Sequence, residues 1–137
     1  MSERILVPYD GSACADEAVA KAMELAGAQG ASLYLLAIAP GEMETAASQL
    51  SASARLMDDL ITFARLGVKL GIDIDGSYLG TPTASLLRTV IENHHVDRVL
   101  MVRNEAGEDT SGNGRLLNAL VDDCPVPVTV LTKETFA

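Results

Sequence analysis

Two short loops in the chain have the composition of binding sites for a small anionic ligand. The first is Asp10-Gly11-Ser12, which follows an apolar run and precedes an alanine-rich amphipathic segment. The second is Gly112-Asn113-Gly114, followed by Arg115 and another apolar segment. Glycines let backbone N–H groups turn towards an anion, and a helix N-terminus adds partial positive charge. The second loop serves equally well as a flexible connection with a helix cap, so both interpretations stay open.

Asp10 is the acidic residue of the first candidate binding loop. Next to Gly11-Ser12 it also suits a tight turn and favours the N-terminus of the helix that follows. A ligand contact and a purely structural role therefore remain equal alternatives. Paired carboxylates for acid–base chemistry would have to combine Asp10 with an acidic residue of another loop, namely Glu42, Glu44, Glu105, Glu108 or Asp109.

The histidines and cysteines form no catalytic or metal-binding pattern. Cys14 falls in the first turn of one predicted helix and Cys124 at the end of another, at opposite edges of the fold and beyond disulfide reach. His94 and His95 with Asp97 resemble a metal site in composition, but consecutive residues at a helix end point in different directions. No histidine falls in the loops at the carboxyl ends of the predicted strands, where ligands bind, so a serine or cysteine triad lacks its general base. We predict no catalytic residue, no metal site and reduced thiols, as is usual in the cytoplasm.

Composition restricts the class of protein further. The 137 residues form one predicted domain, 1–137, with 48% apolar residues and a net charge of −9 from 10 Lys+Arg and 19 Asp+Glu. The basic residues are scattered from Arg4 to Lys133, whereas nucleic-acid binding requires them on one face, so DNA and RNA are poor candidates as partners. The longest apolar run, Leu33 to Ala39, is far shorter than the roughly 20 residues that span a bilayer, and we predict no membrane segment.

Strand-like and helix-like segments alternate along the chain. Strands are predicted at Arg4–Tyr9, Ala31–Ala39, Ile72–Tyr78, Val96–Val102 and Val126–Leu131, with the second buried on both faces and the third nearer an edge. Amphipathic helices are predicted between them, over 13–26, 50–70, 81–91 and 116–121. This alternation is typical of a three-layer α/β/α sandwich built on a five-stranded parallel sheet. Ligands bind such sheets at the carboxyl ends of the strands, where the loops 9–12, 38–43, 79–82 and 102–113 converge.

Several of these segments together resemble the universal stress protein family. The opening Ile5 to Ser12 with its helix resembles the start of that family, and the strand ending in Pro40, the Gly80-Thr81-Pro82 helix start and the closing Cys124 to Val128 follow in the family's order. The resemblance covers essentially the whole chain. It implies a Rossmann-like fold of the adenine nucleotide alpha hydrolase type. It also implies a stress-response or regulatory role and a homodimer formed through the C-terminal strand Val126 to Leu131.

One branch of the family binds ATP, and the resemblance carries its contacts to particular positions of this chain. Adenine and ribose would lie against the loop at Asp10 and the end of the second strand, and the phosphates against a glycine-rich loop before the last helix. The implied cofactor-binding residues are Pro8, Asp10, Gly11, Ser12, Ile38, Met101, Gly112, Gly114 and Arg115.

The phosphate loop departs from the family's pattern. Gly114 is kept, but Arg115 replaces the hydroxyl residue, and the expected first glycine pair is missing around Met101 to Glu105. Side chains in place of glycine keep backbone amides away from phosphate oxygens, and nearby acidic residues oppose a polyanion. We therefore predict a non-catalytic regulatory module with weak or no ATP binding, acting through an unknown protein partner. The alternative is an ATP-binding sensor, with Mg²⁺, that uses a variant phosphate loop.

Overall fold

Helices and strands alternate in the structure as the sequence predicts. The computed structural model describes residues 3–11, 13–38, 46–80, 84–103 and 124–132. The described elements are, in chain order, β1 (Arg4–Tyr9), α1 (Ala13–Gln29), β2 (Ser32–Ile38), α2 (Ala46–Leu70), β3 (Ile74–Gly80), α3 (Ala84–Asn93), β4 (Arg98–Arg103) and β5 (Val128–Thr132). They confirm the α/β fold class, and the helix predicted over 116–121 lies outside the described residues.

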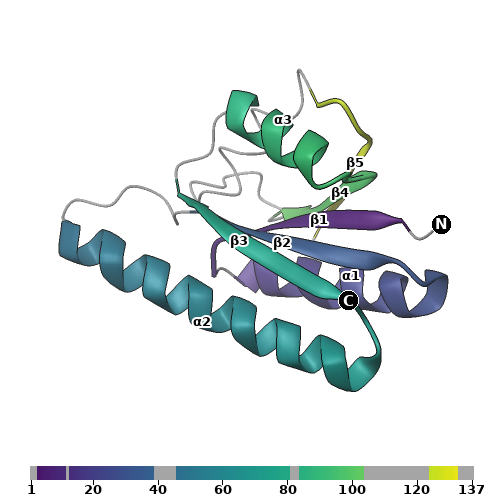
Figure 1. Cartoon of the computed structure of the whole chain (residues 1–137), viewed down its shortest axis with the longest axis horizontal. Coiled ribbons are helices and arrows are strands. Elements are labelled where there is room, and N and C mark those ends of the chain that lie inside the picture. Colours follow the sequence, from purple (N-terminus) through teal and green to yellow (C-terminus); the bar gives the residue numbers. More distant parts are fainter. Residues whose placement is uncertain (1–2, 12, 39–45, 81–83, 104–123, 133–137) are drawn as a thin grey trace.

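The five strands form one parallel sheet in the order β3-β2-β1-β4-β5 (Figure 1). β1 therefore lies in the centre, and β3 and β5 are the two outer strands. β2 is buried along its whole length, because an inner strand of a parallel sheet is covered by helices on both faces. Among the described helices, none is both long and apolar enough to cross a membrane.

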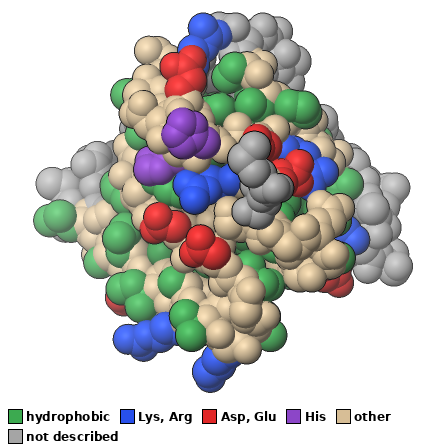
Figure 2. Space-filling view, turned by 45° about the vertical axis from the view of Figure 1, so that its right-hand side comes forward, with side chains coloured by type: hydrophobic (Ala, Val, Ile, Leu, Met, Phe, Trp, Pro, Cys, Tyr) green, Lys and Arg blue, Asp and Glu red, His purple; other side chains and the backbone are tan. Residues whose placement is uncertain are grey.

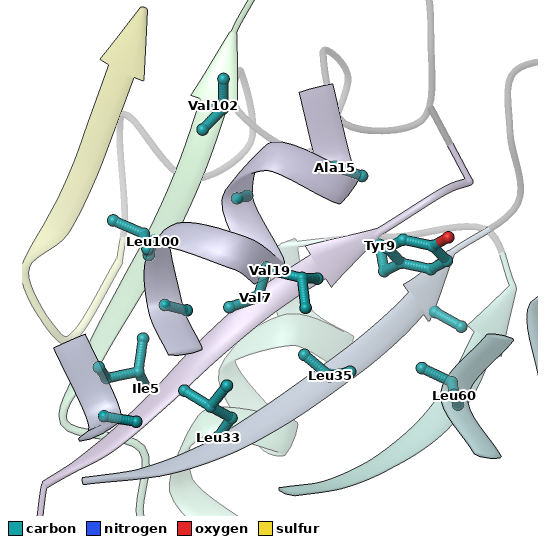
Figure 3. Packing of buried hydrophobic residues seen from close by; sticks show 14 of the residues in the cluster. Ile5, Val7, Tyr9, Ala15, Val19, Leu33, Leu35, Leu60, Leu100 and Val102 are labelled. Atoms are coloured by element: carbon teal, nitrogen blue, oxygen red, sulfur yellow. The ribbon is translucent and has the colours of Figure 1, made fainter. Parts of the chain in front are cut away.

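Alternate residues of the central strands supply two separate cores. Figure 3 shows the first, where Ile5 and Val7 of β1 pack with Leu33 and Leu35 of β2 beneath Val19 of α1. α2 covers another part of the same face of the sheet with Leu56 and Leu60. The strand residues that alternate with those of the first core point to the opposite face and form the second core with α3. This second core comprises Leu6, Tyr34, Leu36, Ile38, Leu87, Ile91, Val96, Val99 and Met101. Of the described helices, two lie on one face of the sheet and one on the other, which gives the predicted three-layer arrangement.

All three described helices end in the same hydrogen-bonded motif. After α1 the N–H of Ala31 donates to the carbonyl of Ala26 at 3.1 Å, with Gly30 at a φ of 71°. After α2 the N–H of Ile72 donates to the carbonyl of Gly67 at 2.8 Å, with Gly71 at 73°. This is the Schellman cap, in which a left-handed residue stops the helix and satisfies its last carbonyls.

The caps explain why the strands predicted from Ile72 and Val96 begin later in the structure. Ile72 and Val96 each donate their N–H to a helix carbonyl, so β3 begins at Ile74 and β4 at Arg98. The last strand begins at Val128, because Pro127 has no N–H to donate to a strand ladder. Ile72 and Val96 belong to the connections and are buried against the core, whereas the carbonyl of Pro127 accepts the N–H of Val99 at 3.0 Å.

The cap of α3 differs because its left-handed residue is His95, with a φ of 54°. A residue with a Cβ is strained in this conformation, whereas glycine is not. We expect His95→Gly to raise the free energy of unfolding by about 0.5–1 kcal/mol, measured by urea denaturation. His95→Ala is the matched control, because it removes the imidazole and keeps the Cβ. Equal stability of the two variants would contradict the role of backbone strain.

Candidate functional site

The candidate site is the carboxyl edge of the sheet beside β1. The chain leaves β1 to form β2 on one side and later returns to form β4 on the other. At such a switch point the connections turn away in opposite directions and leave room for a ligand between them. Residues at the carboxyl ends of β1, β2 and β4 therefore form the base of the site.

Three of the predicted site residues lie at these strand ends and are apolar. Ile38 ends β2, and Met101 lies near the end of β4; both belong to the core on the α3 side. Pro8 is buried and lies two residues after Leu6 of the same core, so strand alternation places it on that side as well. The register Leu6 to Val99 continues to Pro8 beside Met101. The structure thus brings Pro8, Ile38 and Met101 into one buried apolar cluster across three neighbouring strands.

Asp10 and Gly11 form the turn between β1 and α1. Asp10 is only 4% exposed, an unusual degree of burial for a carboxylate. Gly11 has a φ of 82°, which a residue with a side chain rarely adopts, and this explains the glycine at this position. A buried carboxylate therefore lies at the carboxyl end of β1, just before α1.

The carboxyl end of β1 also holds a buried tyrosine between two helices. Tyr9 is 3% exposed, and its ring meets Phe63 of α2 edge-on at 5.4 Å between centroids. Its hydroxyl lies 2.9 Å from Oδ1 of Asp16 on α1 and 3.1 Å from Oδ2 of Asp59 on α2. In Figure 3 the Tyr9 hydroxyl lies at the far end of its strand from Ile5. One phenol thereby ties α1 and α2 together over β1.

The surroundings of Tyr9 keep its hydroxyl neutral. Burial raises its pKa most, and the hydrogen bonds and negative charges of Asp16 and then Asp59 raise it further, well above the usual value of about 10. A phenol with a raised pKa cannot act as a general base at neutral pH. Tyr9 is therefore a positioning residue for the helices that border the site.

Sequence reasoning missed this tyrosine–carboxylate cluster, although one signal was present. Asp59 lies between Leu56 and Phe63 at helical spacing, on the side of α2 that packs inward. A carboxylate on that side indicates a buried polar partner. The identity of the partner depends on how closely α1 and α2 approach, which no local pattern records.

Both histidines of the chain lie at the opposite, amino edge of the sheet. His94 stacks on the buried ring of Tyr34 at 4.3 Å between centroids, and its carbonyl accepts a hydrogen bond from Arg4 Nη1 at 3.0 Å. Asp97 accepts the backbone N–H of Arg4 at 2.8 Å. Figure 2 shows the histidines on this face next to basic and acidic side chains. His94 and Asp97 thus join α3 and β4 to β1.

The remaining predicted site residues lie outside the described residues. These are Ser12, Gly112, Gly114 and Arg115, together with the acidic candidates Glu42, Glu44, Glu105, Glu108 and Asp109. Cys14 is half-buried beside the first core, and Cys124 is half-buried beside the second.

Comparison with known proteins identifies a family with this architecture. A model of the Universal stress protein family matches residues 1–132. No curated protein matches the chain. Among solved structures, a universal stress protein family member from Burkholderia pseudomallei is 18% identical, with a TM-score of 0.73 over 94% of this chain and 95% of that one.

Two other similar structures contain nucleotides. A family protein from Arabidopsis thaliana with AMP bound is 10% identical, with a TM-score of 0.65 over 95% of this chain and 91% of that one. A protein from Archaeoglobus fulgidus in complex with dAMP is 14% identical, with a TM-score of 0.65 over 95% of this chain and 97% of that one. At these identities the likeness concerns the fold alone.

Proposed function

Because the chain belongs to the universal stress protein family, we propose that it is a non-catalytic regulatory module of that family which binds ATP weakly or not at all. The observation that carries the proposal is the position of the histidines. Both lie at the amino edge, about the length of a strand from Asp10, so neither Cys14 nor Asp10 has an imidazole to act with. The only phenol bonded to carboxylates at the carboxyl edge of the described sheet is Tyr9, and it stays protonated.

Weak ATP binding is supported by charge and by backbone chemistry. The protein carries a net charge of −9, and its sequence lacks the first glycine pair of the family's phosphate loop. A triphosphate needs several N–H donors or cations to replace its hydration, and repulsion from a negative protein adds to the cost. Pro8, Ile38 and Met101 carry neither charge nor a side-chain donor for phosphates, and they are buried in the core on the α3 side.

A second candidate function is that of an adenine-nucleotide sensor. It is favoured by the similar structures that contain AMP and dAMP, each with a single phosphate. Asp10 would accept hydrogen bonds from ribose hydroxyls, and the base would lie over the carboxyl ends of β1, β2 and β4. A monophosphate avoids most of the electrostatic cost of ATP. Residues Ser12, Gly112, Gly114 and Arg115 would supply the remaining phosphate contacts, with Mg²⁺ where a longer phosphate chain is bound.

Calorimetric titration of nucleotide-free protein with ATP, ADP and AMP, with and without Mg²⁺, separates the two functions. For the regulatory module we expect a dissociation constant for ATP above about 100 µM, which corresponds to less than about 5.5 kcal/mol of binding free energy. A dissociation constant of a few micromolar for ATP with Mg²⁺ would overturn the proposal.

Matched variants test whether any nucleotide signal arises at the candidate site. Asp10→Asn is expected to weaken AMP binding at least about tenfold if the second function holds, because the ribose hydroxyls lose a charged acceptor. Asp73→Asn is the control, since Asp73 is exposed just before β3 at the amino edge. Equal losses in both variants would place the nucleotide elsewhere.

The proposed module acts as a homodimer in the cytoplasm. β5 is an outer strand, Val130 on it is 36% exposed, and an unpaired apolar edge favours pairing with another chain. These features support a homodimer contact through Val126 to Leu131. The two free cysteines suit a reducing compartment. The family's regulatory role further requires a partner protein, whose identity is open to capture experiments.

A further inference from the structure

The side of α2 next to the outer strand β3 carries an exposed apolar stripe. Apolar residues recur there at intervals of four, three, four, three and four residues, in the order Leu50, Ala54, Met57, Ile61, Ala64 and Val68. We call these six residues the α2 stripe. The four large members are exposed, with Leu50 at 71%, Met57 at 38%, Ile61 at 47% and Val68 at 83%. A helix that served only to cover the sheet would have polar residues at these positions.

The contacts of α2 show which way the stripe faces. Asp59 and Phe63 turn towards Tyr9, on the side of α1. Leu60 and Gly67 turn towards β3, where Leu60 Cδ1 lies against Gly76. The stripe lies roughly 100° further around the helix in the same direction, since successive residues turn by about 100°. It therefore borders the free edge of β3, and in Figure 1 α2 lies along that outer strand, at the end of the sheet away from β5.

The spacing of the stripe is that of a coiled-coil seam. Alternating intervals of three and four residues place side chains at the a and d positions of a heptad, the arrangement that pairs one helix with another. From Leu50 to Val68 the seam is about 27 Å long, at 1.5 Å per residue. The occupant that fits it is therefore another helix with a matching seam.

Two charged side chains beside the seam indicate that the partner helix is α2 of a second copy of the chain. Asp58 and Arg65 occupy successive e positions on the solvent side of the stripe, and both are exposed. Within the described part of the chain neither side chain forms an ion pair. In an antiparallel pair of helices, e positions face e positions, so Asp58 of one copy would meet Arg65 of the second copy, and the reverse. The same register packs Ile61 against Ala64 and Met57 against Val68 of the second copy, and it leaves Leu50 and Ala54 beyond the end of the partner helix.

We propose that the α2 stripe pairs with the α2 stripe of a second copy of this chain, antiparallel, about a two-fold axis between Ile61 and Ala64. Such an interface is self-complementary, because each contact occurs twice. It lies at the opposite edge of the sheet from β5 and is independent of the proposed nucleotide site. With both edges in use, copies of the chain would join into assemblies larger than a dimer.

Sedimentation equilibrium of a Val130→Asp variant, from 5 to 300 µM, tests the proposal with the β5 edge blocked. We expect dimers with a dissociation constant on the order of 10–100 µM, typical of a small interface. Ile61→Asp in that background is expected to raise the constant at least about 30-fold, since two carboxylates would meet near the axis. Leu66→Asp is the matched control and should leave it unchanged, because Leu66 is 39% exposed on the other side of α2.

A charge exchange tests the antiparallel register. Asp58→Arg or Arg65→Asp alone is expected to weaken association about three- to tenfold, because each variant places like charges opposite one another twice. The double variant should return to within about threefold of the starting value. Both residues are exposed, so the variants should fold normally, which circular dichroism checks. Failure of the double variant to recover, or a monomeric Val130→Asp protein at 300 µM, would overturn the proposal and leave the stripe to a different protein.

Discussion

Replacing Gly67 by alanine should destabilise the protein by about 3 kcal/mol, although alanine normally favours a helix over glycine. Gly67 lies in α2 where the helix approaches β3 most closely. A Cβ at this position would lie 2.6 Å from the carbonyl oxygen of Ile72 and 2.8 Å from two side-chain carbons of Ile74. The carbonyl belongs to the backbone of Ile72, whose N–H closes the α2 cap, so the helix and the chain that leads into β3 would have to separate. Thermal unfolding should show a loss of roughly 10 °C.

Gly27→Ala is the matched control for this prediction. Gly27 lies in the exposed part of α1, and a Cβ there would meet nothing within 4 Å. This substitution is expected to stabilise the protein by about 0.5–1 kcal/mol, through helix propensity and a less flexible unfolded chain. If both alanine variants were stabilised, the close contact between α2 and β3 would have to be relieved at almost no cost.

Truncating Tyr9 to alanine should cost about 3–5 kcal/mol of stability, the amount typical of removing a buried aromatic ring. Tyr9→Phe keeps the ring and removes only the hydroxyl, and we expect it to cost about 1–2 kcal/mol. The hydroxyl matters because it is the donor placed between Asp16 and Asp59. Urea denaturation of the three proteins separates the packing contribution from the hydrogen-bond contribution.

The raised pKa of Tyr9 adds a dependence on pH to this comparison. The unfolded tyrosine ionises near pH 10, whereas the folded one stays protonated to higher pH. The folded state then binds more protons than the unfolded state, so its stability is complete below about pH 10 and falls as the pH rises above it. Tyr9→Phe should show a smaller loss between pH 9 and 11. An unchanged alkaline slope would mean that other groups cause the loss.

Hydrophobic pattern was sufficient to predict the sheet, and the reason is visible in β2. Its burial on both faces requires a continuous apolar run, which the sequence displays from Leu33 onwards. Strand boundaries were harder to predict, because apolar residues such as Ile72 and Val96 serve the core while their N–H groups complete helix caps. An apolar residue in sequence does not reveal whether its backbone pairs with a strand or with a helix end.

The site was predictable only where it follows from the order of strands. Pro8, Asp10 and Ile38 could be placed because each lies at or just beyond the carboxyl end of a strand in a parallel sheet. Asp16 and Asp59 could not, since their meeting at Tyr9 depends on the spacing between two helices. His95 in a left-handed conformation also escaped prediction, because glycine is the usual signal for that position.

The central place of β1 has a consequence for how the chain folds during synthesis. β1, β2 and β3 lie within residues 4–80 and can pair in the order in which they leave the ribosome. Until Arg98 and the residues after it follow, β1 is an uncovered edge, and Arg4 lacks its partners Asp97 and His94. The nascent half-sheet therefore exposes the apolar strand β1 along a free edge, and free edges of this kind promote aggregation. When β4 pairs with β1, it closes that edge and anchors the first strand. The last third of the chain therefore protects the first third from aggregation.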